Sequence, residues 1–163
     1  HIHCTRQSYN THNGTLVEFL PSGPRDRTAL WLESRGWRGL AVRAAPRAFL
    51  ALRGRVDALH ACLSPADHPR ELTLNPLQVT YHDPETLESS FSSRVLCLPL
   101  MTVLLAADAT RAHLVLLRSE HALPALKRLP WEDVSLKVTR LEYLLFFFRS
   151  CLCLLIFLLY EYL

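Results

Sequence analysis

Cysteine and histidine are the residues of this chain best suited to metal binding or nucleophilic attack, and it has five and eight of them. The cysteines are an odd, scattered set without a Cys-x-x-Cys pair: Cys4, Cys62, Cys97, Cys151 and Cys153. This pattern is typical of neither a disulfide framework nor a zinc ribbon, and we interpret Cys62 and Cys97 as small buried side chains. No histidine stands beside a serine or cysteine in a nucleophile motif. The sequence therefore predicts no metal site and no catalytic residue.

Phosphate-binding glycine motifs are missing as well. The 163 residues include five glycines, and no two of them form Gly-x-Gly, so the chain has neither a dinucleotide-binding fingerprint nor a P-loop. The net charge of +3 is too small to indicate nucleic acid. Residues 25–55 hold eight arginines and two acids. Because no known nucleic-acid module accompanies them, we interpret this segment as a solvated basic face and expect no nucleic-acid partner.

Short apolar runs alternate with helical patterns along the chain. We expect strands near residues 16–20, 39–43, 56–63, 112–118 and 136–142. The alternation predicts an α/β fold with a mainly parallel sheet and helices on both faces. Ligands bind such sheets at the carboxyl ends of the strands. Each tryptophan lies beside an apolar run, and we expect all three to be buried: Trp31, Trp37 and Trp131.

The chain divides into an N-terminal tail, a domain with a loop-rich insertion, and a hydrophobic tail: residues 1–15, 16–143 (insertion 65–93) and 144–163. The insertion contains four prolines and is expected to form one hairpin, from residues 71–74 and 78–81. Residues 144–160 carry one charge, Arg149. Three interpretations of them stay open: a membrane-associated segment, a closing core element, or an artefactual gene end. Because the chain starts with histidine, we take it to be a processed form or a fragment.

Several blocks of residues follow one another in a characteristic order: Val17-Glu18-Phe19, Leu30-Trp31-Leu32-Glu33, Gly36-Trp37-Arg38-Gly39, Ala61-Cys62-Leu63-Ser64, Cys97-Leu98-Pro99-Leu100 and Leu129-Pro130-Trp131. This order resembles the FkbM-type methyltransferase domain family over residues 16–143. The last two blocks point to its animal branch, which includes Star. The resemblance implies a class I methyltransferase-like, Rossmann-like fold that binds S-adenosylmethionine. For the Star-like branch it implies a membrane protein of the endoplasmic reticulum or Golgi that acts in vesicle-mediated transport.

The cofactor site that the resemblance implies is degenerate. Its candidate residues are Glu18, Gly23, Arg43, Arg118 and Glu120. The glycine-rich loop of the family reads Leu-Pro-Ser-Gly-Pro over residues 20–24, and only Gly23 can stand for a family glycine. Arg43 replaces the acid that binds the ribose hydroxyls, and Arg118 replaces the aspartate of the second motif. Arginine offers hydrogen-bond donors only, and its charge repels a sulfonium cofactor.

We therefore expect a non-catalytic domain with no bound cofactor, a protein partner, and a place at the membrane of the endoplasmic reticulum or Golgi. The alternative is an active S-adenosylmethionine-dependent methyltransferase with a diverged site. Placing both arginines at the cofactor edge also predicts that Arg43→Glu combined with Arg118→Asp raises cofactor affinity.

Overall fold

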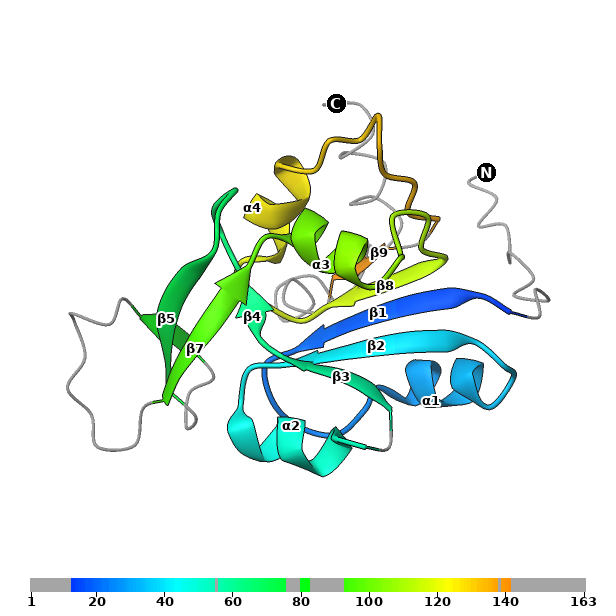
Figure 1. Cartoon of the computed structure of the whole chain (residues 1–163), viewed down its shortest axis with the longest axis horizontal. Coiled ribbons are helices and arrows are strands. Elements are labelled where there is room, and N and C mark those ends of the chain that lie inside the picture. The colour runs from blue at the N-terminus through cyan, green and yellow to red at the C-terminus, as the bar shows by residue number, and fades with distance from the viewer. Residues whose placement is uncertain (1–12, 55, 76–79, 83–92, 138, 142–163) are drawn as a thin grey trace, which may run out of the picture.

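The computed structural model describes residues 13–54, 56–75, 80–82, 93–137 and 139–141 (Figure 1). The first half of the described chain contains β1 (Thr15–Leu20), α1 (Arg27–Glu33), β2 (Arg38–Arg43), α2 (Pro46–Leu52) and β3 (Asp57–His60). The second half contains β4 (Cys62–Leu63), β5 (Arg70–Asn75), β6 (Thr80–His82), β7 (Ser93–Leu98), α3 (Leu100–Ala106), β8 (Leu114–Leu117), α4 (Ala122–Lys127) and β9 (Thr139–Leu141).

The main sheet has five strands in the order β3-β2-β1-β8-β9, and each neighbouring pair is parallel. In chain order these are strands 3-2-1-4-5 of the sheet, which is the order of doubly wound nucleotide-binding folds. The winding reverses between β1 and β8, so this point is the topological switch of the sheet. The expected α/β fold with a mainly parallel sheet is confirmed, and so is a strand within each of the five expected ranges.

Helices cover both faces of this sheet, as expected. Buried side chains of α3 and α4 pack with Val17 and Phe19 of β1 on one face. Buried side chains of α1 pack with Leu16 of β1 on the other face. The second helix, α2, lies on the same face as α1, because Phe49 stacks on His60 of β3 with 5.2 Å between ring centroids. The alternation of side chains along each strand produces these two layers.

A second, four-stranded sheet in the order β4-β7-β5-β6 lies beside the first (Figure 1). The expected hairpin is confirmed as the antiparallel pair of β5 and β6. The sequence did not predict that β5 also pairs with β7. The expected single strand over residues 56–63 is wrong, since it breaks at Ala61 into β3 and β4, which belong to different sheets. An apolar run indicates a strand but not the sheet in which it pairs.

One of the three tryptophans is buried. Trp37 is 4% exposed, and a Cβ added to Gly14 would lie 2.4 Å from its ring atoms. The expectation of burial is wrong for Trp31 and Trp131, which are 46% and 38% exposed. Trp31 lies on α1 away from the buried residues of that helix, and the guanidinium of Arg35 stacks 4.2 Å from the ring centroid of Trp31. The apolar residues next to Trp31 in the sequence therefore do not indicate that its ring lies on the buried side of α1.

Several sequence features lie outside the described residues. They include Cys4, the two cysteines of the tail at 151 and 153, and the apolar stretch 144–160. Within the described ranges, no helix has the length and apolar character needed to cross a membrane.

Candidate functional site

The candidate site lies at the carboxyl ends of β1, β2 and β8, where a doubly wound sheet binds its ligands. The loop after β1 is held against the end of β2, because the carbonyl of Pro21 accepts hydrogen bonds from the amides of Ala44 (3.2 Å) and Ala45 (2.8 Å). Gly23, the candidate glycine of this loop, is exposed and has a φ of 87°, in the left-handed region that favours glycine. A Cβ at Gly23 would have no atom within 4 Å. The loop therefore needs Gly23 for its backbone conformation.

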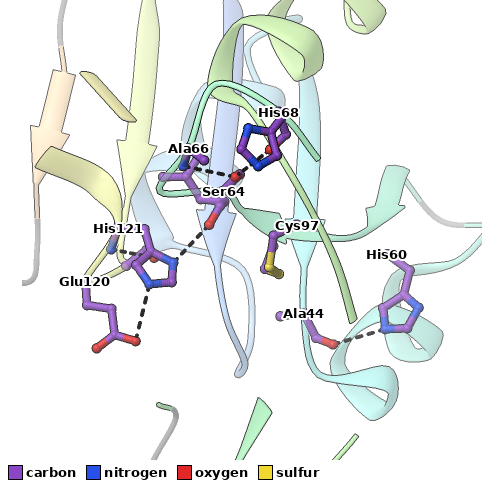
Figure 2. Close-up of a disulfide and its surroundings, with 11 residues drawn as sticks. Ala44, His60, Ser64, Ala66, His68, Cys97, Glu120 and His121 are labelled. Carbon is purple, nitrogen blue, oxygen red and sulfur yellow. Dashed lines mark hydrogen bonds and ion pairs between the residues drawn. A yellow bond between two sulfur atoms is a disulfide. The ribbon is translucent and has the colours of Figure 1, made fainter. Parts of the chain in front are cut away.

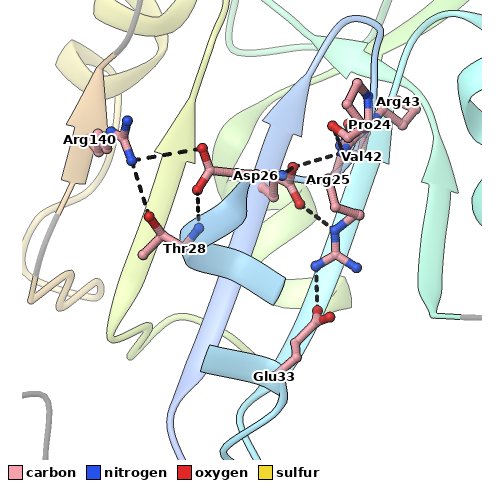
Figure 3. A network of polar contacts seen from close by, with 9 residues as sticks. Pro24, Arg25, Asp26, Thr28, Glu33, Val42, Arg43 and Arg140 are labelled. Atoms are coloured by element: carbon pink, nitrogen blue, oxygen red, sulfur yellow. Dashed lines mark hydrogen bonds and ion pairs between the residues drawn. The ribbon is translucent and has the colours of Figure 1, made fainter. Parts of the chain in front are cut away.

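Glu18 is the centre of a buried ion network, and Figure 3 labels its partners Arg25 and Arg43. Its Oε1 atom accepts hydrogen bonds from Nη2 of Arg43 and from the backbone amide of Asp26, both at 2.8 Å. Its Oε2 atom accepts one from Nε of Arg25 at 2.5 Å. The carboxylate is fully buried, so these three donors take the place of water. Glu18 thus ties the end of β2 and the loop after β1 to the middle of the sheet.

Arg43 ends β2, where the family resemblance places the ribose-binding acid, and its side chain is fully buried. Besides Glu18, its guanidinium donates to the carbonyls of Val42 (3.1 Å) and Pro24 (3.3 Å). Burial lowers the pKa of Arg43, and Glu18 opposes that shift. The buried Arg43 side chain is therefore directed to Glu18 and the β1 loop.

Arg25 completes the network and was not singled out by the sequence. Its side chain, 4% exposed, pairs with both Glu18 and Glu33. Burial alone would lower the pKa of Arg25, but hydrogen bonds to Glu33 and Glu18 raise it above its ordinary value. Two arginines thus balance two carboxylates. Among the described residues, Nη1 of Arg25 and Nε of Arg43 are the buried side-chain atoms without a hydrogen-bond partner.

This geometry argues against the expectation that Arg43→Glu combined with Arg118→Asp raises cofactor affinity. Arg43→Glu would add a third carboxylate beside Glu18 and Glu33, with Arg25 as the remaining cation of the network. Breaking a buried pair in this way costs about 3–5 kcal/mol. The variant is expected to lose stability rather than gain affinity. The sequence position of Arg43 gave no sign of Glu18, because the two residues are 25 positions apart.

The other two candidates, Arg118 and Glu120, lie on the loop after β8. Arg118 is exposed, and its backbone amide donates to the carbonyl of Phe19 at 2.9 Å. The carboxylate of Glu120 lies 3.7 Å from Nε2 of His121. His121 in turn donates from Nδ1 to the carbonyl of Leu63 at 3.0 Å, which links this loop to β4 (Figure 2). The structure thus joins Glu18 to Arg43 in one network and places Glu120 in a separate set of contacts.

The hollow between these loops is small. It is lined by the ends of β1 and β2, by Ala61–Leu63, and by Arg118 and Ser119, and its volume is about 10 Å³. That volume is at the lower limit for one water molecule. Pockets for drug-sized ligands typically measure about 300–1,000 Å³. This hollow by itself is therefore far smaller than a pocket for such a ligand.

A disulfide joins Cys62 of β4 to Cys97 of β7 beside this hollow (Figure 2). The two cysteines are direct partners in the parallel register, with their Cα atoms 4.2 Å apart. Both cysteines are buried, as expected, but the expectation that the cysteines form no disulfide is wrong. They are separated by 35 positions, so no local spacing revealed the pair. Only the pairing of β4 with β7 brings the two sulfur atoms together.

Metal ligands do not cluster in the part of the chain that the structure describes. Within it, no group of three or more His, Cys, Asp or Glu side chains is arranged to hold an ion.

Two aspartates, Asp26 and Asp67, have pKa values below the ordinary value of aspartate because of neighbouring groups. The side chain of His68 lowers that of Asp67, and the amide of Thr28 lowers that of Asp26 against an opposing effect of burial.

The fold and the site together define an α/β domain with a doubly wound parallel sheet and a buried ion network at its carboxyl edge. No family model, curated protein or solved structure matches the chain. The class of the domain therefore rests on its strand order, and its function on the chemistry of the residues at this edge.

Proposed function

We propose that this chain is a catalytically degenerate, FkbM-type methyltransferase-like domain that acts as an interaction scaffold in membrane traffic of the endoplasmic reticulum and Golgi. The parallel strand order 3-2-1-4-5 supports the Rossmann-like part of this proposal. One observation carries its non-catalytic part. Arg43 at the end of β2 is buried and bound to Glu18, at the position where the resemblance implies a ribose-binding acid.

The residues at the carboxyl edge do not fit S-adenosylmethionine. Ribose hydroxyls need a hydrogen-bond acceptor at the end of β2, and the guanidinium of Arg43 has donors only. Glu18 already accepts three hydrogen bonds from the protein. Leu20 and Pro21 occupy the loop where the resemblance implies a glycine next to the cofactor, and both line the hollow of about 10 Å³. Each of these features favours a scaffold over an enzyme.

The disulfide between Cys62 and Cys97 supports a location in the lumen of the endoplasmic reticulum or Golgi. Disulfides form and persist in the secretory lumen and are rare in the reducing cytosol. Both cysteines are buried, at 3% and 0% exposure, as expected for a structural bond. A domain that faces the lumen of the endoplasmic reticulum or Golgi can keep this bond.

A cofactor titration tests the non-catalytic part of the proposal. Calorimetry and thermal melting of the full chain with up to 1 mM S-adenosylmethionine are expected to show no binding heat and no rise in Tm. A site filled at 100 times its Kd would stabilise the fold by about 2.7 kcal/mol, a shift that melting detects easily. A methyltransferase of known affinity serves as the positive control. Micromolar binding would refute the scaffold and support the alternative, an active methyltransferase with a diverged site.

The location is tested separately in cells. A tagged full chain is expected to fractionate with endoplasmic reticulum or Golgi membranes. When the chain is unfolded in denaturant, Cys62 and Cys97 are expected to resist a thiol-alkylating reagent until a reductant is added. The variant Cys62→Ala is the matched control, because it leaves Cys97 as a free thiol that is alkylated in denaturant without reductant. A cytosolic chain with both thiols reduced would contradict the proposed compartment.

A further inference from the structure

The two crossover helices α1 and α2 lie on one face of the parallel sheet (Figure 1). Both expose arginine together with large apolar residues. On α1, Ala29 and Leu32 are buried, while Arg27, Leu30 and Trp31 are exposed. The exposed residues have the spacing i, i+3, i+4, which is one side of a helix. The side of α1 that faces away from the sheet is therefore both basic and apolar.

The second helix repeats this arrangement. Arg47 and Leu50 of α2 are exposed at the spacing i, i+3, and Leu50 is 59% exposed. Arg53 follows at the C-cap of α2 and is also exposed. We call the exposed residues of both helices and the connections after them the α1–α2 face: Arg27, Leu30, Trp31, Arg35, Arg47, Leu50 and Arg53.

The charge of the α1–α2 face has one sign. Between residues 27 and 54, all of which the structure describes, the single acid is Glu33. Its side chain is 20% exposed and is paired with Arg25. The four arginines of the α1–α2 face therefore stand without an exposed carboxylate in this segment. The next exposed acid along the described chain is Asp57, at the start of β3.

The last described strand, β9, lies close to this face. Arg140 of β9 contacts α1, with its Nη1 atom 3.3 Å from Oγ1 of Thr28 and 3.8 Å from Oδ2 of Asp26. The described chain ends one residue later, and the sequence continues into residues 144–160, which carry one charge. The last described strand thus lies beside α1, and the most apolar segment follows it in the sequence.

We propose that the α1–α2 face is a docking surface for anionic phospholipid membranes. Arginine binds phosphate headgroups, tryptophan favours the headgroup level, and exposed leucine side chains can enter the acyl boundary. Two helices lying over a sheet present a broad layer, which suits a planar bilayer.

A vesicle flotation assay with the full chain, made by cell-free translation, tests this surface. Vesicles contain phosphatidylcholine alone or with 30% phosphatidylserine. The charge variant is Arg27→Gln with Arg47→Gln, and its matched control is Arg94→Gln with Lys127→Gln, two exposed cations on β7 and α4. The charge variant is expected to lose about 30-fold in affinity for anionic vesicles, since each arginine near such a surface contributes about fivefold. The control is expected to bind like the parent.

The aromatic part of the face is tested with Trp31→Ala against Trp131→Ala, a comparably exposed tryptophan elsewhere. Weaker anionic-vesicle binding is expected for the first variant alone. The proposal is overturned if the charge variant and its control bind anionic vesicles equally. It is also overturned if the parent chain binds neutral vesicles as tightly as anionic ones, or if it binds polyglutamate but not vesicles. Circular dichroism melting verifies that every variant is folded. None of these outcomes depends on the cofactor titration, so the two proposals can fail independently.

Discussion

The buried network around Glu18 makes the sharpest prediction about stability. Glu18→Gln keeps the size of the side chain and removes its charge. The change leaves the buried guanidinium of Arg43 without its carboxylate, and Arg25 with Glu33 alone. Removing one partner of a buried ion pair costs about 3–5 kcal/mol because the other charge stays buried and uncompensated. The free energy of unfolding of a domain is about 5–15 kcal/mol, so a large share of it is at stake.

The expected loss is readily measured. For a chain of this size, 1 kcal/mol shifts Tm by about 2–4 °C, so Glu18→Gln is expected to lower Tm by about 6–20 °C. Urea denaturation of the parent and the variant gives the change in free energy directly. The matched control is Glu33→Gln, which removes a carboxylate with a 20% exposed side chain from the same network. Its loss is expected to be about 1 kcal/mol, because water can reach the vacated position.

A double variant separates the charge effect from simple loss of packing. Glu18→Leu with Arg43→Met replaces both members of the pair by apolar residues, and such exchanges are often neutral or stabilising. The double variant is expected to be more stable than Glu18→Gln, with Arg25 still paired to Glu33. If Glu18→Gln and Glu33→Gln have the same small effect, the assignment of Glu18 as the centre of the network is wrong.

Three further predictions concern the core, the disulfide and a helix cap. Trp37→Ala is expected to cost about 3–5 kcal/mol in urea denaturation because Trp37 is buried, while the exposed Trp131→Ala stays within about 1 kcal/mol. Removing the disulfide, by Cys62→Ala with Cys97→Ala, is expected to cost about 3–4 kcal/mol in the chain-entropy model, and an unchanged Tm would contradict the bond. The amide of Thr28 donates to Oδ1 of Asp26 at 2.7 Å and helps hold the pKa of Asp26 below its ordinary value, so the contribution of this cap to stability is present above about pH 4 and is lost as pH falls through the lowered pKa. Asp26→Asn keeps the cap and is expected to remove this part of the acid sensitivity, which melting between pH 2 and 6 measures.

Local features of the sequence were enough to locate the main-sheet strands. Runs such as residues 16–20 and 39–43 are mostly apolar and end at proline or a charged residue. They therefore indicate strands even when the strands that pair with them are unknown. The alternation of strands with helical segments then required parallel pairing, because a helix connection returns the chain in the same direction. The break at Ala61 escaped this reasoning, since nothing in the run of residues 56–63 indicates that β3 and β4 join different sheets.

The sequence by itself determined the α/β class, the positions of the main strands and the lack of a glycine-rich phosphate loop, since each depends on residues close together in the chain. Only the tertiary structure decided the pairing of Glu18 with Arg43 and of Cys62 with Cys97, which are 25 and 35 positions apart. Strand order and register bring those side chains together, and neither is encoded in a local pattern. The exposure of Trp31 was decided in the same way, because burial depends on which side of α1 packs against the sheet. The sequence thus predicted Arg43 at a cofactor site, and only the long-range packing of β2 against β1 shows that it forms a buried ion pair with Glu18.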